Sequence, residues 1–349
     1  MATLVPKDIN GGGADYSTVQ LWEDAIPDFT SIDEYWEGSL YGEVSGTGTL
    51  VSFSAHNNTS TRFWHLMAAS GEGLDTPASQ ALAYDGTLGA AQLNTGGYSD
   101  LFLIAAANDY LKFTGVQFKS SGGSINGMMR WTGVADNATV KKCLGQMTGS
   151  LNAAHNTIVF AKSSNSLFES SCFIQHDQDR PALRFDYGTA GTISFCTIVA
   201  PSDLSNSAAA IVLNNSTNLV INSTAIFGFA SGVNLIGSGS TASTGSGYNS
   251  TDLASGLPTA GGGAANQYSL TFTSQFVTTT VSGMDFQAVA SGSLDAFGDP
   301  TAPPTDIYGQ TRAASPYCGA HEIVSGGGGA TPKGPLGLPL HGPLKGPVY

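Results

Sequence analysis

Residues 111–118 read LKFTGVQF, and four related stretches follow at nearly fixed intervals: VKKCLGQM at 140–147, LFESSCFI at 167–174, ISFCTIVA at 193–200 and LVINSTAI at 219–226. Their first residues lie 29, 27, 26 and 26 positions apart. Each stretch alternates apolar and polar residues, and three of the five carry a cysteine at nearly the same place. Self-similarity at a period of roughly 20 to 50 residues is the signature of a solenoid.

A second series of apolar runs keeps step with the first, beginning at Ile158, Ala182, Ala210 and Gly232. Each repeat is therefore a coil containing at least two short strands. The alternation places one face of every strand inward, and like strands of successive coils pair along the axis at roughly 4.8 Å per coil. The pattern predicts an all-β fold, a right-handed single-stranded parallel β-helix, and it lacks the leucine and asparagine density of a leucine-rich repeat. Asparagine, which tolerates tight turns, recurs where the coils must turn, at Asn214, Asn215, Asn218 and Asn222.

The composition agrees with this fold. Of 349 residues, 45 are glycine and only 11% are charged, which suits many turns and stacked strands better than helices. A solenoid absorbs this length as one elongated domain, which we place at residues 16–325. The net charge of −13 repels nucleic acid and anionic membranes, so neither is an expected partner. We expect no secretory signal and no transmembrane helix, because the sequence shows neither pattern.

The cysteines and histidines form no metal-binding pattern. The four cysteines lack C-x-x-C spacing and the histidines are isolated, so we expect no metal and no cofactor. Cys143, Cys172 and Cys196 fall on strand positions. We expect them to be reduced and to point inward, where a thiol packs as a small hydrophobe.

The N-terminal residues precede the regular repeat. Residues 1–15 are expected to form an extended arm that ends at the glycines of residues 11–13. Ser17 and Gln20 then have capping-box spacing, and an apolar stripe that includes Trp22 predicts a short amphipathic helix at about residues 17–26. A solenoid must cover the apolar mouth of its first coil. We therefore expect this helix to be an N-terminal cap.

At about 27 residues per coil, the chain from Trp36 to Val324 allows roughly ten coils.

Two stretches near the C-terminal end resemble a known pattern. GMDFQAVASGSLDAFGDP at 283–300 and DIYGQTRAASPYCGAHE at 306–322 resemble the closing coils of bacterial and phage parallel β-helix proteins. In these the pattern runs D-F-x-L, G-S-P-x-x-D-x-G, D-x-x-G-x-x-R and D-I-G-A-x-E. Leu294 replaces the usual proline, and Tyr317 and Cys318 replace Asp-Ile. The matching residues are Asp285, Phe286, Gly292, Ser293, Asp295, Gly298, Asp306, Gly309, Arg312, Gly319, Ala320 and Glu322.

The opening DYSTVQLWEDA at residues 15–25 is similar to the start of β-helix proteins of tailed-phage genomes. Together these resemblances place the chain among the pectin-lyase-like, right-handed parallel β-helix proteins of the kind found in tailed-bacteriophage virions. The fold supports many functions, so the resemblance implies a fold and a virion role as expectations only.

Residues 326–349 differ in kind from the repeats. Four glycines at 326–329 form a flexible joint, after which GPLGL, GPLKGP and GPVY repeat a proline, glycine and aliphatic theme. Such proline density excludes a helix or a central strand and predicts an extended attachment tail. An extended peptide with aliphatic side chains suits a groove on a partner. The expected partner-binding residues are Leu336, Leu338, Leu340, Leu344, Val348 and Tyr349.

The densest group of ionisable residues is HDQDRPALRFD at 176–186. Paired carboxylates can cleave glycosides as acid and base, and the β-helix fold includes pectate lyases, polygalacturonases and tailspike glycosidases. A solvated turn also explains Asp177 and Asp179, however, and the polygalacturonase motifs N-T-D, D-D, G-H-G and R-I-K are missing. We therefore assign no catalytic residue and treat the group as a candidate carbohydrate contact, formed by His176, Asp177, Asp179, Arg180, Arg184 and Asp186.

The sequence favours a structural virion protein of a tailed phage, a decoration or minor head or tail protein that docks through its terminal tail. Its expected partners are other virion proteins: capsid, tail, or copies of itself, for example in a homotrimer. One alternative is a carbohydrate-binding β-helix, such as a tailspike or receptor-binding protein that contacts host polysaccharide, with lyase or glycosidase activity if it is an enzyme. Another is an extracellular bacterial surface adhesin.

Overall fold

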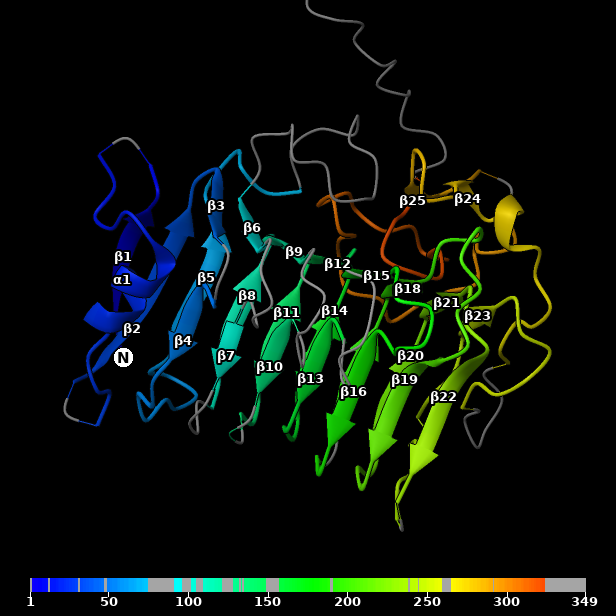
Figure 1. Cartoon of the computed structure of the whole chain (residues 1–349), viewed down its shortest axis with the longest axis horizontal. Helices are drawn as coiled ribbons and strands as arrows, with labels where there is room; N and C mark the ends of the chain where they lie inside the picture. The colour runs from blue at the N-terminus through cyan, green and yellow to red at the C-terminus, as the bar shows by residue number, and fades with distance from the viewer. Residues whose placement is uncertain are drawn as a thin grey trace, which may run out of the picture.

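The computed structural model shows an elongated stack of β-strand coils (Figure 1). It describes residues 2–11, 13–30, 32–46, 49–74, 91–95, 102–104, 109–120, 128–131, 133, 135–148, 157–188, 191–237, 239–243, 245–258, 265–290 and 292–323. The tail at residues 326–349, with its six expected partner-binding residues, lies outside this part of the chain. No helix in the part described is long and apolar enough to cross a membrane.

Three parallel sheets run along the stack, and each of the seven coils from β2 to β22 contributes one strand to each sheet in turn. Sheet A consists of β1 (Thr3–Ile9), β2 (Glu34–Leu40), β5 (Trp64–Ala68), β8 (Lys112–Thr114), β11 (Thr139–Lys141), β14 (Leu167–Glu169), β17 (Thr192–Ser194) and β20 (Val220–Asn222). Sheet B consists of β3 (Glu43–Gly46), β6 (Gln92–Thr95), β9 (Gln117–Ser120), β12 (Leu144–Met147), β15 (Cys172–Gln175), β18 (Thr197–Val199), β21 (Ala225–Phe227) and β23 (Ser250–Thr251). Sheet C consists of β4 (Val51–Phe53), β7 (Phe102–Ile104), β10 (Met129–Trp131), β13 (Val159–Ala161), β16 (Leu183–Asp186), β19 (Ala209–Asn214) and β22 (Ser231–Ile236). The predicted parallel β-solenoid is confirmed.

The repeats stack in a single register. Phe113, Val140, Phe168, Ile193 and Ile221 stand in one row of sheet A, and all five are fully buried. The predicted alignment, which started each repeat at its first apolar residue, placed Val140 level with Leu111. In the structure Val140 lies opposite Phe113, two positions further along. A shift of two residues keeps the same side chains facing inward, because strand side chains alternate with a period of two.

A left-handed residue forms the corner between sheets A and B in five successive coils. These residues have φ between 48° and 72°, and they are Gly115, Lys142, Ser170, Phe195 and Ser223. The N–H of each of the first four donates to a carbonyl of the next coil, as from Lys142 to Glu169 O at 3.0 Å. Non-glycine residues in this region cost roughly 1–2 kcal/mol, which the stacking must offset. Of the predicted turn asparagines, Asn215 and Asn218 have positive φ, whereas Asn214 and Asn222 end strands.

The central core fills the space between the three sheets. Its N-terminal half is aromatic: Trp64 stacks on Phe53 with ring centroids 4.2 Å apart, and Trp22 meets Trp64 edge-on at 6.0 Å. Cys143 and Cys196 lie in this core, as predicted, and all four cysteines are free thiols. Burial raises the pKa of both core thiols to about 12.

A second core lies on the outer face of sheet B. There the C-terminal segment, residues 265–323, packs against β12, β15, β18 and β21. This segment contains the short helix η1 (Phe272–Ser274) and the antiparallel pair β24 (Phe276–Thr278) and β25 (Asp285–Ala288). Figure 1 shows these elements beside the stack. We expected residues 283–322 to form closing coils in a stack of roughly ten, but they add no strand to the three sheets.

Cys172 belongs to this second core, contrary to the predicted inward position. It stands opposite Leu144, whereas Cys143 stands beside Ser171 and one position earlier in the register. A difference of one residue turns a side chain to the opposite face of the sheet. Cys172 is nevertheless fully buried, because the C-terminal segment covers it.

The N-terminal residues take part in the stack. Residues 3–9, expected within a free arm, form β1 and pair with β2 along its whole length. Helix α1 (Val19–Ala25) is N-capped by Thr18, whose side chain accepts from the Leu21 N–H, and not by Ser17 as the capping-box spacing suggested. Trp22 from this helix is fully buried in the central core.

Gln20, on the outer side of α1, bonds to the edge of sheet C. Its Oε1 accepts from the Ser52 N–H at 2.7 Å and its Nε2 donates to the Ser52 carbonyl at 3.4 Å. Glu23 accepts from the Ser54 N–H and from His56 Nε2. The two side chains thus supply the hydrogen bonds that a further strand would make to β4.

Candidate functional site

Three of the six residues in the predicted carbohydrate cluster line one groove. His176, Asp177 and Asp179 follow β15 in the turn that leaves sheet B. The groove has a volume of about 310 Å³, and its other lining residues are Thr148, Gln178, Leu204 and Val281. Val281 comes from the C-terminal segment, so that segment forms part of the wall of the groove.

The other three residues of the cluster point elsewhere. Arg184 and Asp186 stand two residues apart on β16 of sheet C and form a two-pronged pair, with Nε–Oδ1 at 3.0 Å and Nη2–Oδ2 at 3.3 Å. Arg180 donates to the Asp179 carbonyl at 3.4 Å and does not line the groove. The structure therefore divides the sequence cluster between two surfaces.

The groove residues are already engaged in local structure. Asp177 Oδ1 accepts from the Asp179 N–H, and Asp179 Oδ1 accepts from Ser207 Oγ of the next coil at 2.5 Å. Burial lowers the pKa of His176 to about 4, so its ring is neutral at pH 7. Exposed Asp179 and neutral His176 can hydrogen-bond the hydroxyl groups of a ligand. No group of three metal-ligating side chains occurs in the part of the chain that the structure describes.

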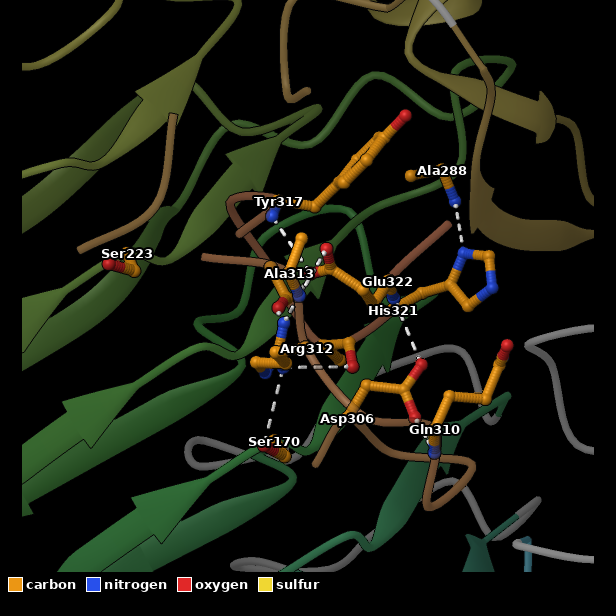
Figure 2. Close-up of polar contacts among 12 residues, drawn as sticks. Ser170, Ser223, Ala288, Asp306, Gln310, Arg312, Ala313, Tyr317, His321 and Glu322 are labelled. Carbon is orange, nitrogen blue, oxygen red and sulfur yellow. Dashed lines mark hydrogen bonds and ion pairs between the residues drawn. The ribbon is translucent and has the colours of Figure 1, made fainter. Parts of the chain in front are cut away.

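A denser polar site lies between the C-terminal segment and sheet B (Figure 2). Its centre is Arg312, which pairs with Glu322 at 3.3 Å, and both side chains are almost fully buried. Arg312 Nη2 also donates to the carbonyls of Gly319 and Ala320 and to Ser170 Oγ at the corner of a coil. Its guanidinium lies 4.4 Å from the ring centroid of Phe195, the corner residue of the next coil. Arg312 thus joins the C-terminal segment to two coils.

The two carboxylates of this site bind backbone N–H groups. Glu322 accepts from Tyr317 at 2.9 Å and from Ala313 at 3.3 Å. Asp306 accepts from Tyr308 and Gln310 through Oδ1 and from Glu322 through Oδ2. Burial raises the pKa of Glu322 and lowers that of Arg312, while their mutual attraction opposes both shifts.

His321 connects this site to β25. Its Nδ1 accepts from the Ala288 N–H at 3.1 Å, which requires an unprotonated nitrogen (Figure 2). Burial, with a smaller effect from nearby Arg312, lowers the pKa of His321 from 6.5 to about 4. The neutral ring also packs edge-on against Tyr308, with centroids 5.5 Å apart.

The residues of the resemblance motif therefore have structural roles. Gly319 has a φ of +108°, its N–H donates to the Ser223 carbonyl at 2.8 Å, and a Cβ there would stand 2.9 Å from Thr197 Oγ1. The N–H of the following residue, Ala320, donates to the same Oγ1. The motif spaces Asp306, Arg312 and Glu322 so that one buried network holds the segment to sheet B. Sequence reasoning identified these residues but not their contacts.

No protein-family model, curated protein or solved structure matches this chain. The interpretation of its function therefore rests on its own residues and geometry.

Arg312→Met should release the C-terminal segment, because it leaves the buried Glu322 without its cationic partner, and breaking a buried ion pair in this way typically costs roughly 3–5 kcal/mol. We expect Cys172 and Cys318 of the second core to react with a maleimide, while Cys143 and Cys196 of the central core stay protected. Peptide mass spectrometry after labelling identifies the modified thiols. The control is Arg312→Met with Glu322→Gln, which removes both charges and should restore part of the protection. Full protection of Cys318 in Arg312→Met would contradict the assigned role.

Acid should weaken the structure through His321. A group with a folded-state pKa below its unfolded value stabilises the fold above the unfolded pKa, and that stability is lost as pH falls from 6.5 towards 4. His321→Asn keeps an acceptor for the Ala288 N–H but cannot titrate. We expect the free energy of unfolding, measured with urea between pH 7 and 4.5, to fall more steeply with falling pH in the wild type than in His321→Asn. The difference in slope should be up to about 1.4 kcal/mol per pH unit. The raised pKa of Glu322 acts in the opposite direction in both proteins and cancels in the difference. Equal slopes would contradict the role of His321.

Proposed function

We propose that this protein is a structural component of a tailed-phage virion, a rigid rod that attaches to other virion proteins through residues 326–349. One observation carries the proposal: the C-terminal segment is fixed to the outer face of sheet B by the Arg312–Glu322 network. Ile323, the last residue described, packs against the second core. The described chain thus ends at a fixed point on the flank of the rod, two residues short of the expected tail.

This arrangement suits docking. The surface of the rod belongs to a chain with 26 acidic and 13 basic residues, whereas residues 331–349 contain four leucines, a valine and a tyrosine. Each leucine buried in a partner contributes roughly 1.5–3 kcal/mol before the cost of ordering the peptide.

The hand of the coil, the capping role of α1, the location and the partners are also part of the proposal, and they follow from the resemblance and from general geometry. We take the coil as right-handed, because connections between parallel strands in one sheet adopt that hand almost without exception. We take α1 as the cap of the first coil, supported by the burial of Trp22 and by the bonds from Gln20 to β4. The location is the virion, and the partners are capsid or tail proteins or other copies of this chain.

A second candidate is carbohydrate binding by a tailspike or receptor-binding protein. The groove beside His176 and Asp179 supports it, because an open hollow of about 310 Å³ with polar and apolar walls suits a sugar ring. This site makes no use of the tail.

Deletion of residues 326–349 distinguishes attachment through the tail from carbohydrate binding in the groove. We expect the thermal unfolding midpoint of the truncated protein to stay within about 2 °C of wild type, because the segment that precedes the tail makes its own contacts. Incorporation into particles, measured by mass spectrometry of purified virions, should fall at least tenfold. The control keeps the length of the tail but replaces Leu336, Leu338, Leu340 and Leu344 with serine, and it should behave like the deletion.

A normal copy number of the truncated protein on virions would contradict the proposal. Binding of host polysaccharide by the wild-type protein, lost in Asp179→Asn, would favour the second candidate.

A further inference from the structure

The N-terminal end of the rod is protected against the addition of another strand. In a parallel strand, the peptide groups of alternate residues face opposite neighbours. Tyr16 donates to the Asp8 carbonyl from outside β1, so even-numbered residues of β1 face outward. Pro6, which has no N–H, stands among them. Proline at such a position is a known device for blocking edge pairing.

The other two sheets are protected at this end by side chains. Gln20 bonds both peptide groups of Ser52 on β4 of sheet C, and Glu23 accepts from Ser54. On β3 of sheet B, Asn10 Nδ2 donates to the Glu43 carbonyl at 2.9 Å. Each of the three N-terminal edges therefore has its own protection.

The opposite end is different. Beyond β20, sheet A continues through the bridges Leu219–Ala242 and Asn222–Gly247, and beyond β23, sheet B continues through Ser250–Gln267. Sheet C ends at β22, and within the described residues no strand or bridge lies beyond it. Among the described residues the three sheets thus end unequally: β22 is an edge to which no further strand or bridge is added, and Gly256 and Leu257 lie beside its Gly232.

The peptide groups of β22 that point away from β19 can form hydrogen bonds with another strand. The Asn215 N–H donates to the Ile236 carbonyl at 2.9 Å, so even-numbered residues face β19 and the peptide groups of Ser231, Val233 and Leu235 face outward. Leu235 is 50% exposed and Ile236 43%. Beside the strand lies an apolar groove of about 210 Å³, lined by Val233, Leu235, Ala242, Gly256, Leu257 and Pro258.

This end of the rod is also almost free of charge. Residues 204–284 contain one charged side chain, Asp252, in a chain with a net charge of −13. Asp252 Oδ2 accepts from the Gly228 N–H, and its side chain is partly buried. Two copies of an acidic protein repel each other least where they meet through such a surface.

We propose that β22 pairs antiparallel with β22 of a second copy about a two-fold axis at Val233. Ser231 then lies opposite the second copy's Leu235, and Val233 opposite the second copy's Val233. The outward groups of three residues on each strand give about six N–H···O bonds, since bonded antiparallel pairs exchange two each. The groove of each copy is covered by the other, and sheet C runs continuously through two rods joined end to end.

The geometry selects this partner over others. A head-to-tail chain of rods would need β22 to pair with an N-terminal edge, and on each of those three edges a proline or a side chain blocks an outward peptide group. A sheet edge accepts one strand, so this contact joins two copies and not the three of the expected homotrimer. A two-fold contact uses the same surface on both copies and closes without further growth. The inference does not depend on the proposed virion function.

Sedimentation velocity of the full chain at micromolar concentration tests the proposal. The wild-type protein should have the mass of two chains. Leu235→Lys should weaken the dimer at least about 100-fold, because it replaces an apolar side chain of the contact with a charged one that loses water opposite the second copy's Ser231. Leu21→Lys is the matched control, since Leu21 is also 50% exposed but lies on α1 at the other end. It should remain dimeric.

A second variant tests the backbone bonds. Val233→Pro removes an outward N–H and leaves the bonds to β19 intact, so it should give monomers with an unchanged far-UV circular dichroism spectrum. The proposal is overturned by a wild-type monomer or trimer, or by equal dissociation of Leu21→Lys and Leu235→Lys. It is also overturned if deletion of residues 326–349 abolishes the dimer, since the occupant of the edge would then be the tail.

Discussion

Every strand of the stack makes its backbone hydrogen bonds to a strand one coil away, some 25 to 28 residues along the chain in the row from Phe113 to Ile221. The whole structure depends on all coils keeping that register. A slip of one residue would turn the buried side chains of a strand outward. The left-handed corner residues resist such a slip, because each must stand directly between sheets A and B. The same rule leaves an edge of each sheet at each end of the stack, and the two ends differ in how these edges are covered.

The repeat could be predicted from the sequence because alternation and period are local properties. The predicted alignment was wrong by two residues at Val140, and its side chain was still correctly predicted to face inward. At Cys172 a difference of one residue placed the side chain on the opposite face of the sheet. Residues 3–9 were read as an arm, because β1 lies before the regular repeat and resembles its partner β2 little in sequence. A pairing of that kind depends on residues about 31 positions apart, as in Thr3 opposite Glu34, which no local pattern reveals.

The sequence contains a signal that the outer face of sheet B is covered. Runs such as CFI at 172–174 and IVA at 198–200 are apolar without alternation, which is typical of strands covered on both faces. The motif residues Asp306, Arg312 and Glu322 were recognised by resemblance, but spacing alone does not show that they form a buried network. Likewise, HDQDRPALRFD is contiguous in sequence, yet β15 and β16 lie in different sheets, so the cluster was divided. Sequence proximity predicts a shared site poorly when the chain turns between two faces.

The C-terminal segment forms a fixed outer layer of the rod, and amide hydrogen exchange tests this most directly. The amides of Ile307, Cys318, Gly319 and Ala320 bond to Ala320 O, Leu294 O, Ser223 O and Thr197 Oγ1. Exchange followed by mass spectrometry should show peptides covering residues 306–322 protected within about tenfold of those covering β17 and β18, because exchange from a docked segment requires its release. Exchange of residues 306–322 at the rate of an unstructured peptide, with β17 and β18 still protected, would contradict the account.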